Sequence, residues 1–215
     1  MPTPRLGYHL ADGTKVPSVT TVIGRFKESG GLIHWAWEQG RDGKDYREER
    51  DTAADIGTLA HAMMEAKIHS LPFFAPPEAD PANVEKARVP FHAFEQWAGD
   101  VNFTITDTEV GLVSEKYRYG GTLDACLIRG ERSIGDWKTS NRVYADHIVQ
   151  LAAYRNLWNE THPDDQASVG AHLVRFAKET GDFTHHFFAD LDEAWRAFVL
   201  ERELYDLMAS LKRRV

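Results

Sequence analysis

The stretch YGGTLDACLIRGERSIGDWKTS, residues 119–140, places charged residues inside two runs that otherwise have the composition of buried strands. Asp124 lies between a leucine and an alanine, and Asp136 and Lys138 lie on either side of Trp137. A buried charge is costly unless an opposite charge or a metal ion compensates it. Three such charges in one segment therefore indicate a function for it.

The two runs fit the two strands of a hairpin. Residues 117–129 and 132–139 have strand-like composition, and Gly130 marks the turn between them. If the strands pair in antiparallel fashion across this turn, Asp124 and Asp136 come to lie side by side. The hairpin is therefore predicted to present a pair of carboxylates.

Lys138 adds a positive charge to this pair, since side chains two positions apart on a strand share one face of the sheet. Asp136 and Lys138 should project together, while Trp137 packs on the opposite face. Two carboxylates with one ammonium group suit a hard divalent cation such as Mg²⁺ or Mn²⁺. A lysine beside such a cation can orient a water molecule or stabilise charge on a phosphate. These residue types predict metal-assisted hydrolysis of a phosphodiester.

The rest of the chain alternates between helical and strand patterns. We expect helices over residues 55–68, with Asp55 as the cap, and over 83–98, 145–160 and 191–211; further strands are expected over 101–113, 167–177 and 183–190. Residues 16–26 fit a short strand or the start of a helix, and residues 40–51 fit an exposed loop or a short helix. This order predicts an α/β protein in which a central mixed sheet carries helices on its faces.

Composition narrows the class of protein. A chain of 215 residues suits one domain, with residues 1–52 as a helical or loop extension at its N-terminus. No apolar run is long enough to span a membrane, and the first residues lack the apolar core of a signal peptide. The single cysteine, Cys126, excludes an internal disulfide and a four-cysteine iron–sulfur cluster. We expect a cytoplasmic protein whose net charge of −8 argues against unspecific binding of polyanions but permits a local basic groove.

Four motifs together resemble one enzyme superfamily. The segments GGTLDA and SIGDWKTS resemble the GxxD…DxK signature of the PD-(D/E)xK nucleases, in the form found in RecB-like exonucleases. GTLAHAMME resembles their G-x-x-x-H motif through Gly57 and His61, and QLAAY matches their Q-x-x-x-Y motif through Gln150 and Tyr154. An isolated D…DxK is a weak signal, whereas four elements in the right order over residues 53–160 are specific. The resemblance implies a restriction-endonuclease-like αβββαβ core of the cluster-free, single-domain type found among small phage and mitochondrial exonucleases.

The resemblance also implies a role for each matched residue in the hairpin. Asp124 and Asp136 would ligate the metal, with the backbone carbonyl of Trp137 as a further ligand. Lys138 would position the nucleophilic water. His61 would be another metal ligand, or would lie beside a second metal, so that one or two Mg²⁺ or Mn²⁺ ions are implied.

The residues outside the hairpin have less specific implied roles. Gln150 and Tyr154 would hold the DNA strand or brace the catalytic loop. Some members of the family carry a further acidic residue on the strand before the hairpin. Glu109 is the first candidate for this position and Glu115 is the second.

The function implied is a metal-dependent DNA exonuclease acting on single strands or on the ends of linear DNA, in recombination, repair or replication. Recombination or replication proteins would be its protein partners, and a phage source fits the resemblance. Two alternatives remain open on the sequence. One is a catalytically silent nuclease-like subunit for DNA binding or assembly, and the other is a structure-specific endonuclease.

Several features have ordinary structural explanations as well. Asp136 and Lys138 could form a plain ion pair, and His61 could be an ordinary helix histidine. His185 and His186 should face opposite sides of a strand, so a shared metal site is not expected there. Aromatic residues near the N-terminus could stack on bases but usually pack; they are Trp35, Trp37 and Tyr46. Basic residues near the hairpin could contact phosphates; they are Lys116, Arg118, Arg129, Arg132 and Arg142.

Overall fold

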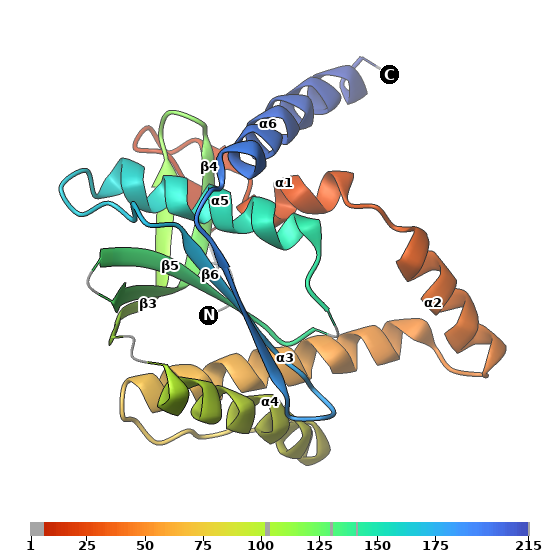
Figure 1. Ribbon diagram of the computed structural model, residues 1–215. Helices are drawn as coiled ribbons and strands as arrows, with labels where there is room; N and C mark the ends of the chain where they lie inside the picture. Colours follow the sequence, from red (N-terminus) through yellow and green to blue (C-terminus); the bar gives the residue numbers. More distant parts are fainter. Residues whose placement is uncertain (1–6, 102–103, 130, 141, 215) are drawn as a thin grey trace.

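The computed structural model describes residues 7–101, 104–129, 131–140 and 142–214 (Figure 1). The predicted turn at Gly130 lies outside the described residues. In chain order the described elements are β1 (Tyr8–His9), β2 (Lys15–Val16), α1 (Val19–Phe26), α2 (Gly30–Arg41), α3 (Tyr46–Ile68), α4 (Pro81–Asp100), β3 (Thr104–Ser114), β4 (Tyr119–Arg129), β5 (Glu131–Lys138), α5 (Ala145–Thr161), β6 (Ala171–Phe176), β7 (Phe183–Phe188) and α6 (Asp192–Lys212).

The central sheet has five strands in the order β3-β4-β5-β6-β7. Neighbouring strands run antiparallel except for β5 and β6, which are parallel and are joined through α5. A parallel connection needs a crossover of this kind, and α5 provides it. The two-stranded sheet of β1 and β2 lies apart from this ladder and is joined to it where the backbone N–H of Gly120 donates to the carbonyl of Pro17.

Helices cover both faces of the sheet (Figure 1). Apolar side chains from α1, α5 and α6 pack on one face, and those from α3 and α4 pack on the other. A helix layer followed by β3, β4, β5, α5 and β6 is the αβββαβ order that the resemblance implies. The prediction of an α/β fold with a mixed central sheet between helices is therefore confirmed.

One helix begins earlier than predicted. We expected its start near Asp55, whereas α3 begins at Tyr46, and the side chain of Asp45 caps it by accepting a hydrogen bond from the N–H of Arg47. The first two turns of α3 are polar and largely exposed, so they show no apolar periodicity. An N-cap aspartate with acids in the first turn is the signal that marks this start.

The N-terminal segment contributes to the core and to the surface in different ways. Val19 and Val22 of α1 are fully buried against the face that carries α5, and Ser18 caps α1 by accepting a hydrogen bond from Thr21 N–H. Helix α2 has no buried residue and stands away from the sheet between α1 and α3 (Figure 1). No described helix is both long enough and apolar enough to cross a membrane.

Gly121 offers a direct test of the packing between β4 and α5. A Cβ atom at this position would lie 2.7 Å from Tyr154 Cε1 and 3.1 Å from both Leu157 Cδ1 and Val19 Cγ2. We expect Gly121→Ala to lower the free energy of unfolding by about 1–3 kcal/mol, because these neighbours are packed too tightly to move apart freely. Urea denaturation measures the change. Gly99→Ala is the matched control, since its Cβ would enter open space, and equal stability of the two variants would contradict this packing.

Candidate active site

Three acidic residues lie level with one another on three neighbouring strands. The pairing of adjacent residues places Glu109 of β3 beside Asp124 of β4, and Asp124 beside Asp136 of β5. The ladder between β4 and β5 ends with the pair Ala125–Gly135, so the two strands separate at this row of acids. The predicted neighbourhood of Asp124 and Asp136 is thus present in the register of the strands.

The carboxylate of Asp124 takes the place of a ladder bond where the strands separate. Its Oδ2 accepts a hydrogen bond of 2.7 Å from the backbone N–H of Trp137. The N–H and C=O of one strand residue point to the same edge, so the Trp137 carbonyl is directed toward β4 as well. The Trp137 side chain packs between Phe94 and Trp97 on the opposite face of the sheet, as predicted.

Asp136 and Lys138 form a buried ion pair. Lys138 Nζ lies 2.7 Å from Asp136 Oδ2, and the Asp136 residue is only 1% exposed. The Lys138 ammonium occupies Oδ2, whereas no described residue donates a hydrogen bond to Oδ1. A buried carboxylate with unused acceptor capacity is a suitable ligand for a cation.

Burial dominates the protonation of these groups. It raises the pKa of Asp136 to about 6, although the Lys138 ammonium opposes the shift, and it also raises the pKa of Asp124. Burial alone would lower the pKa of Lys138, but the attraction of Asp136 and Asp124 outweighs it, so that this pKa is raised. Lys138 therefore keeps its proton at neutral pH.

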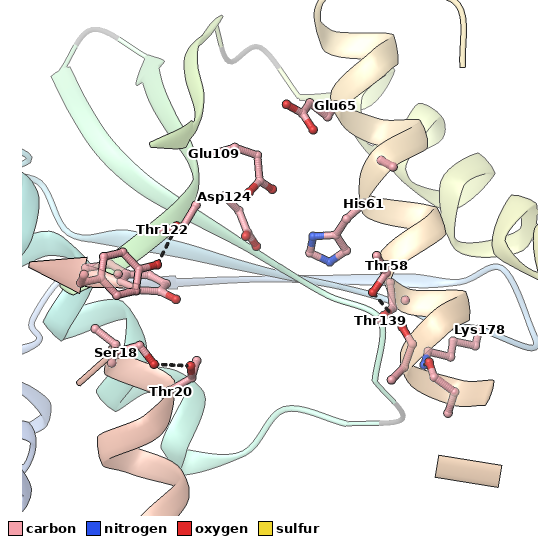
Figure 2. Close-up of a pocket in the computed structure, with 18 residues that line it drawn as sticks. Ser18, Thr20, Thr58, His61, Glu65, Glu109, Thr122, Asp124, Thr139 and Lys178 are labelled. Carbon is pink, nitrogen blue, oxygen red and sulfur yellow. Dashed lines mark hydrogen bonds between the residues drawn. The ribbon is translucent and has the colours of Figure 1, made fainter. Parts of the chain in front are cut away.

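A second group of ligand atoms shares Asp124. His61, Glu109 and Asp124 each offer an atom within 4.8 Å of the others, and Figure 2 shows the three side chains converging. Burial raises the pKa of Glu109 to about 7, with a further contribution from Asp124, and burial lowers the pKa of His61 to about 4. His61 is thus a neutral imidazole at neutral pH, with a ring nitrogen able to bind a metal.

Glu109 has a left-handed backbone conformation, with φ of 53°. For a residue with a Cβ atom, this backbone conformation costs roughly 1–2 kcal/mol. Glu109 does not pair in the ladder, although Thr108 and Val110 on either side of it do. Strain of this kind is often concentrated at functional sites, and here it coincides with one of the two acids grouped with His61.

The Gly-x-x-x-His motif has a geometric basis in α3. A Cβ at Gly57 would lie 2.9 Å from Thr139 Oγ1, so the absence of a side chain lets the helix approach the end of β5. His61 lies one helical turn further along the same face, where it lines the pocket together with Asp124. Gly57 thus lets α3 approach β5, and His61 reaches the pocket beside Asp124 from the same face of the helix.

Gln150 and Tyr154 also form a unit. Gln150 Nε2 donates a hydrogen bond of 2.8 Å to Tyr154 Oη, and both residues are buried in α5. Tyr154 packs against Gly121, three residues before Asp124, and lines the same pocket. This arrangement connects the helix to the strand that carries Asp124.

The other sequence candidates are more dispersed. Glu115 lies at the far end of β3, where it accepts a hydrogen bond from Ala11 N–H. Arg132 is ion-paired with Asp165, and the side chain of Arg129 lies outside the described residues. Trp37 is exposed on α2.

The remaining candidates make contacts that do not reach the row of acids. The Lys116 ammonium lies over Tyr117, and Arg142 lies over Tyr144. The carbonyl of Arg118 accepts a hydrogen bond from Arg202, and His185 contacts His172 and Trp97. Trp35 lies within α2, and Tyr46 is the first residue of α3, with Arg47 over its ring.

Glu109, Asp124 and His61 line a pocket of about 560 Å³, whereas Asp136 and Lys138 are not among the residues that line it. Sequence reasoning missed several of its lining residues: Tyr8, Ser18, Thr20, Thr58, Glu65, Thr122, Thr139 and Lys178. Most of them carry no motif signal. Thr139 and Lys178, however, follow the ends of two adjacent parallel strands, and residues at the carboxyl ends of such strands often meet at a ligand site.

No family model matches the chain, and no curated protein matches it. Among solved structures, one match is the "Putative exonuclease" from Eubacterium rectale, with 15% identity and a TM-score of 0.42 over 81% of this chain. The chain spans 65% of the length of that protein. Another is SSO0001, with 16% identity and a TM-score of 0.35 over 72% of this chain and 74% of that protein. These likenesses are weak, so the functional assignment depends on the site itself.

We expect Mn²⁺ to raise the melting temperature of the wild-type protein at mildly alkaline pH, because an ion that binds only the folded state stabilises it. Without metal, Asp124→Asn and Asp136→Asn should melt at or slightly above the wild-type temperature, since a raised pKa means that the fold disfavours the charged carboxylate. Neither variant should gain stability from Mn²⁺. Equal metal-induced shifts in all three proteins, measured by scanning fluorimetry, would remove these residues from the ligand set.

The same metal-induced shift should shrink as pH falls, because metal ligands must be deprotonated. With a pKa of about 7 for Glu109 and about 6 for Asp136, protons compete with the ion below these values. In the metal-free protein the two raised pKa values contribute stability at low pH, and this contribution is lost as pH rises through them. A metal-induced rise in melting temperature that stays constant as pH falls through about 7 and about 6 would contradict the raised pKa values.

Proposed function

We propose that this protein is a Mg²⁺- or Mn²⁺-dependent deoxyribonuclease of the RecB-like branch of the PD-(D/E)xK superfamily. It acts as an exonuclease on linear DNA, either single-stranded or at duplex ends. One observation carries the proposal: Glu109, Asp124 and Asp136 lie level on three neighbouring strands at the point where β4 and β5 separate, with His61 facing them and Lys138 ion-paired with Asp136. The motif resemblance supports the same reading.

The residues present fit a divalent cation. Asp136 is buried with an Oδ1 that accepts no hydrogen bond from a described residue, and His61, Glu109 and Asp124 bring three further ligand atoms close together. Asp124 belongs to both groups and would be shared by two ions if two bind. When bound, the metal would lower the pKa of a water molecule and neutralise charge on the phosphate. An imidazole in a set of carboxylates favours Mn²⁺ over Mg²⁺, which prefers oxygen ligands.

Lys138 would act on the water and on the phosphate. Asp136 holds its ammonium group beside the row of acids, and its raised pKa keeps it charged. A charged donor fixed at this position can orient the attacking water and stabilise the negative charge that develops on the phosphate. Gln150 and Tyr154 would be positioning residues, because Tyr154, held by Gln150, packs against Gly121 and so fixes the strand that carries Asp124.

DNA is the substrate in this proposal, with recombination or replication proteins as partners and the cytoplasm of a phage-infected or bacterial cell as the setting. Residues 1–215 would form a single nuclease domain. Residues 7–26 would belong to its core rather than to an extension, since Val19 and Val22 are buried under α5. Trp37, exposed on α2, would be available to stack on a base of the substrate.

The proposal predicts metal-dependent loss of linear DNA. Linear single-stranded, linear duplex and circular DNA are each incubated with Mn²⁺, Mg²⁺ or EDTA, and the products are separated on a gel. We expect degradation of linear DNA with Mn²⁺ or Mg²⁺ and none with EDTA. Cutting of circles would change the assignment to an endonuclease. No cleavage with either metal would favour a silent DNA-binding or assembly subunit.

Lys138 separates catalysis from simple ion pairing. We expect Lys138→Ala to lower the rate of cleavage by about 10²–10³-fold while the protein still binds Mn²⁺, since loss of one charged stabiliser has effects of this size. Lys138→Arg should also be poorly active, because a planar guanidinium cannot replace a compact ammonium in a tight site. Initial rates with a labelled oligonucleotide measure both. Near-wild-type cleavage by Lys138→Arg would make Lys138 a structural ion-pair partner.

A further inference from the structure

Lys178 lies at the end of the pocket that is formed by the carboxyl ends of β5 and β6. It follows β6 by two residues, and Thr139 follows β5 directly. Both line the pocket beside Gly57 and Thr58 of α3 (Figure 2). Lys178 Nζ would lie 3.9 Å from a Cβ at Gly57, and Thr139 Oγ1 would lie 2.9 Å from it, so the two polar groups meet at the same bare stretch of helix.

The Lys178 ammonium group has a backbone anchor and no acidic partner. It donates a hydrogen bond of 2.6 Å to the carbonyl of Ala53, and no carboxylate of the described residues forms an ion pair with it. Burial lowers its pKa, which is the effect expected for a half-buried cation whose charge is not neutralised. Among the described residues that line the pocket, Lys178 is the single lysine or arginine.

Charge is unevenly distributed along the wall that α3 provides. Gly57, His61 and Glu65 follow one another at intervals of four residues, or about 6 Å each. Lys178 and Thr139 lie at the Gly57 end, the row of acids lies at His61, and Glu65 extends the acidic region beyond it. A chain of phosphates would therefore be attracted toward Lys178 and repelled at the Glu65 end.

We propose that Lys178 and Thr139 form a binding site for a phosphate of the substrate strand that is not itself cleaved and that lies next to the reacting phosphate. The inference rests on the proposed nuclease function and adds the course of the strand. The strand runs along α3, with its cleaved phosphate at His61 and its following phosphate at Lys178. The acidic Glu65 end then receives the terminal nucleotide, which fits an enzyme that acts on ends.

The chemistry of this end of the pocket suits a phosphodiester rather than a base. An ammonium group and a hydroxyl donate to phosphate oxygens, and the missing side chain at Gly57 leaves room for the phosphate to approach the helix. Thr139 Oγ1 makes no hydrogen bond with any residue that the structure describes. Contacts of this kind hold the backbone without reading its sequence, so the site predicts binding that is independent of base identity.

The test measures the salt dependence of binding. A short fluorescein-labelled oligothymidylate is titrated with protein in Ca²⁺, and anisotropy is recorded between about 50 and 200 mM KCl. For Lys178→Met we expect binding about tenfold weaker, together with a slope of log affinity against log salt that is smaller by about 0.7, the value for one lost contact with single-stranded nucleic acid. Lys178→Arg should keep the wild-type slope. Lys86→Met, an equal loss of charge on the exposed face of α4, should match the wild type.

Stability and cleavage assays separate the ways in which the inference can fail. If Lys178→Met melts early because the bond to Ala53 is lost, Thr139→Val keeps that bond and should still weaken binding several-fold without changing the slope. A wild-type slope for Lys178→Met, in a protein that binds and cleaves DNA, would overturn the phosphate site and leave the nuclease assignment intact. Absence of both binding and cleavage in the wild type would instead overturn the proposed function, and the phosphate site with it.

Discussion

The separation of β4 from β5 beyond Ala125–Gly135 is the constraint on which the site depends. If the antiparallel ladder continued, backbone bonds would occupy the edge that faces the acids. Instead the Asp124 carboxylate accepts the N–H of Trp137, and β5 continues its pairing with β6 alone. One side chain thus satisfies the backbone at the point of divergence and remains available to a cation. The charges of Asp124, Asp136 and Lys138 lie inside the protein because β4 and β5 separate at this point.

Two close approaches between helices and strands stabilise this opening. Gly57 lets α3 reach Thr139 at the end of β5, and Gly121 lets Tyr154 of α5 reach β4 just before Asp124. The helices lie on opposite faces of the sheet, so the diverging strands are supported from both sides. The Gly57–His61 motif of α3 and the Gln150–Tyr154 motif of α5 are distant in sequence, yet they support the same pair of strands, β4 and β5. Each glycine is needed because a side chain would obstruct the contact. Backbone conformation is not the reason, since neither glycine has a positive φ.

The sequence predicted the parts of the site that follow from the period of a strand. Antiparallel pairing of two strands across one turn predicts that Asp124 and Asp136 are neighbours. The alternation of side chains along a strand predicts that Trp137 points to the opposite face. The strain at Glu109 could not be predicted, because it arises where the ladder between β3 and β4 skips this residue opposite Asp124. The direction of the pKa shift of Lys138 could not be predicted either, since burial and two carboxylates act on this pKa in opposite directions.

Two other features were missed for different reasons. Lys178 comes to the site through the parallel pairing of β5 with β6, which a motif search does not detect. The early start of α3 was missed because its first turns are polar on every side, although Asp45 is a good cap. In both cases the informative signal is present in the sequence, but it takes the sheet topology or the cap geometry to interpret it.

The central claim is that the row of acids binds a divalent cation, and anomalous scattering from crystals soaked in Mn²⁺ tests it most directly. We expect an anomalous peak in contact with the carboxylates of Asp124 and Asp136, or between Asp124, Glu109 and His61. Two peaks that share Asp124 would fit a two-ion site. Ordered crystals with Mn²⁺ bound only to surface carboxylates, and with none at Asp124, would contradict the account.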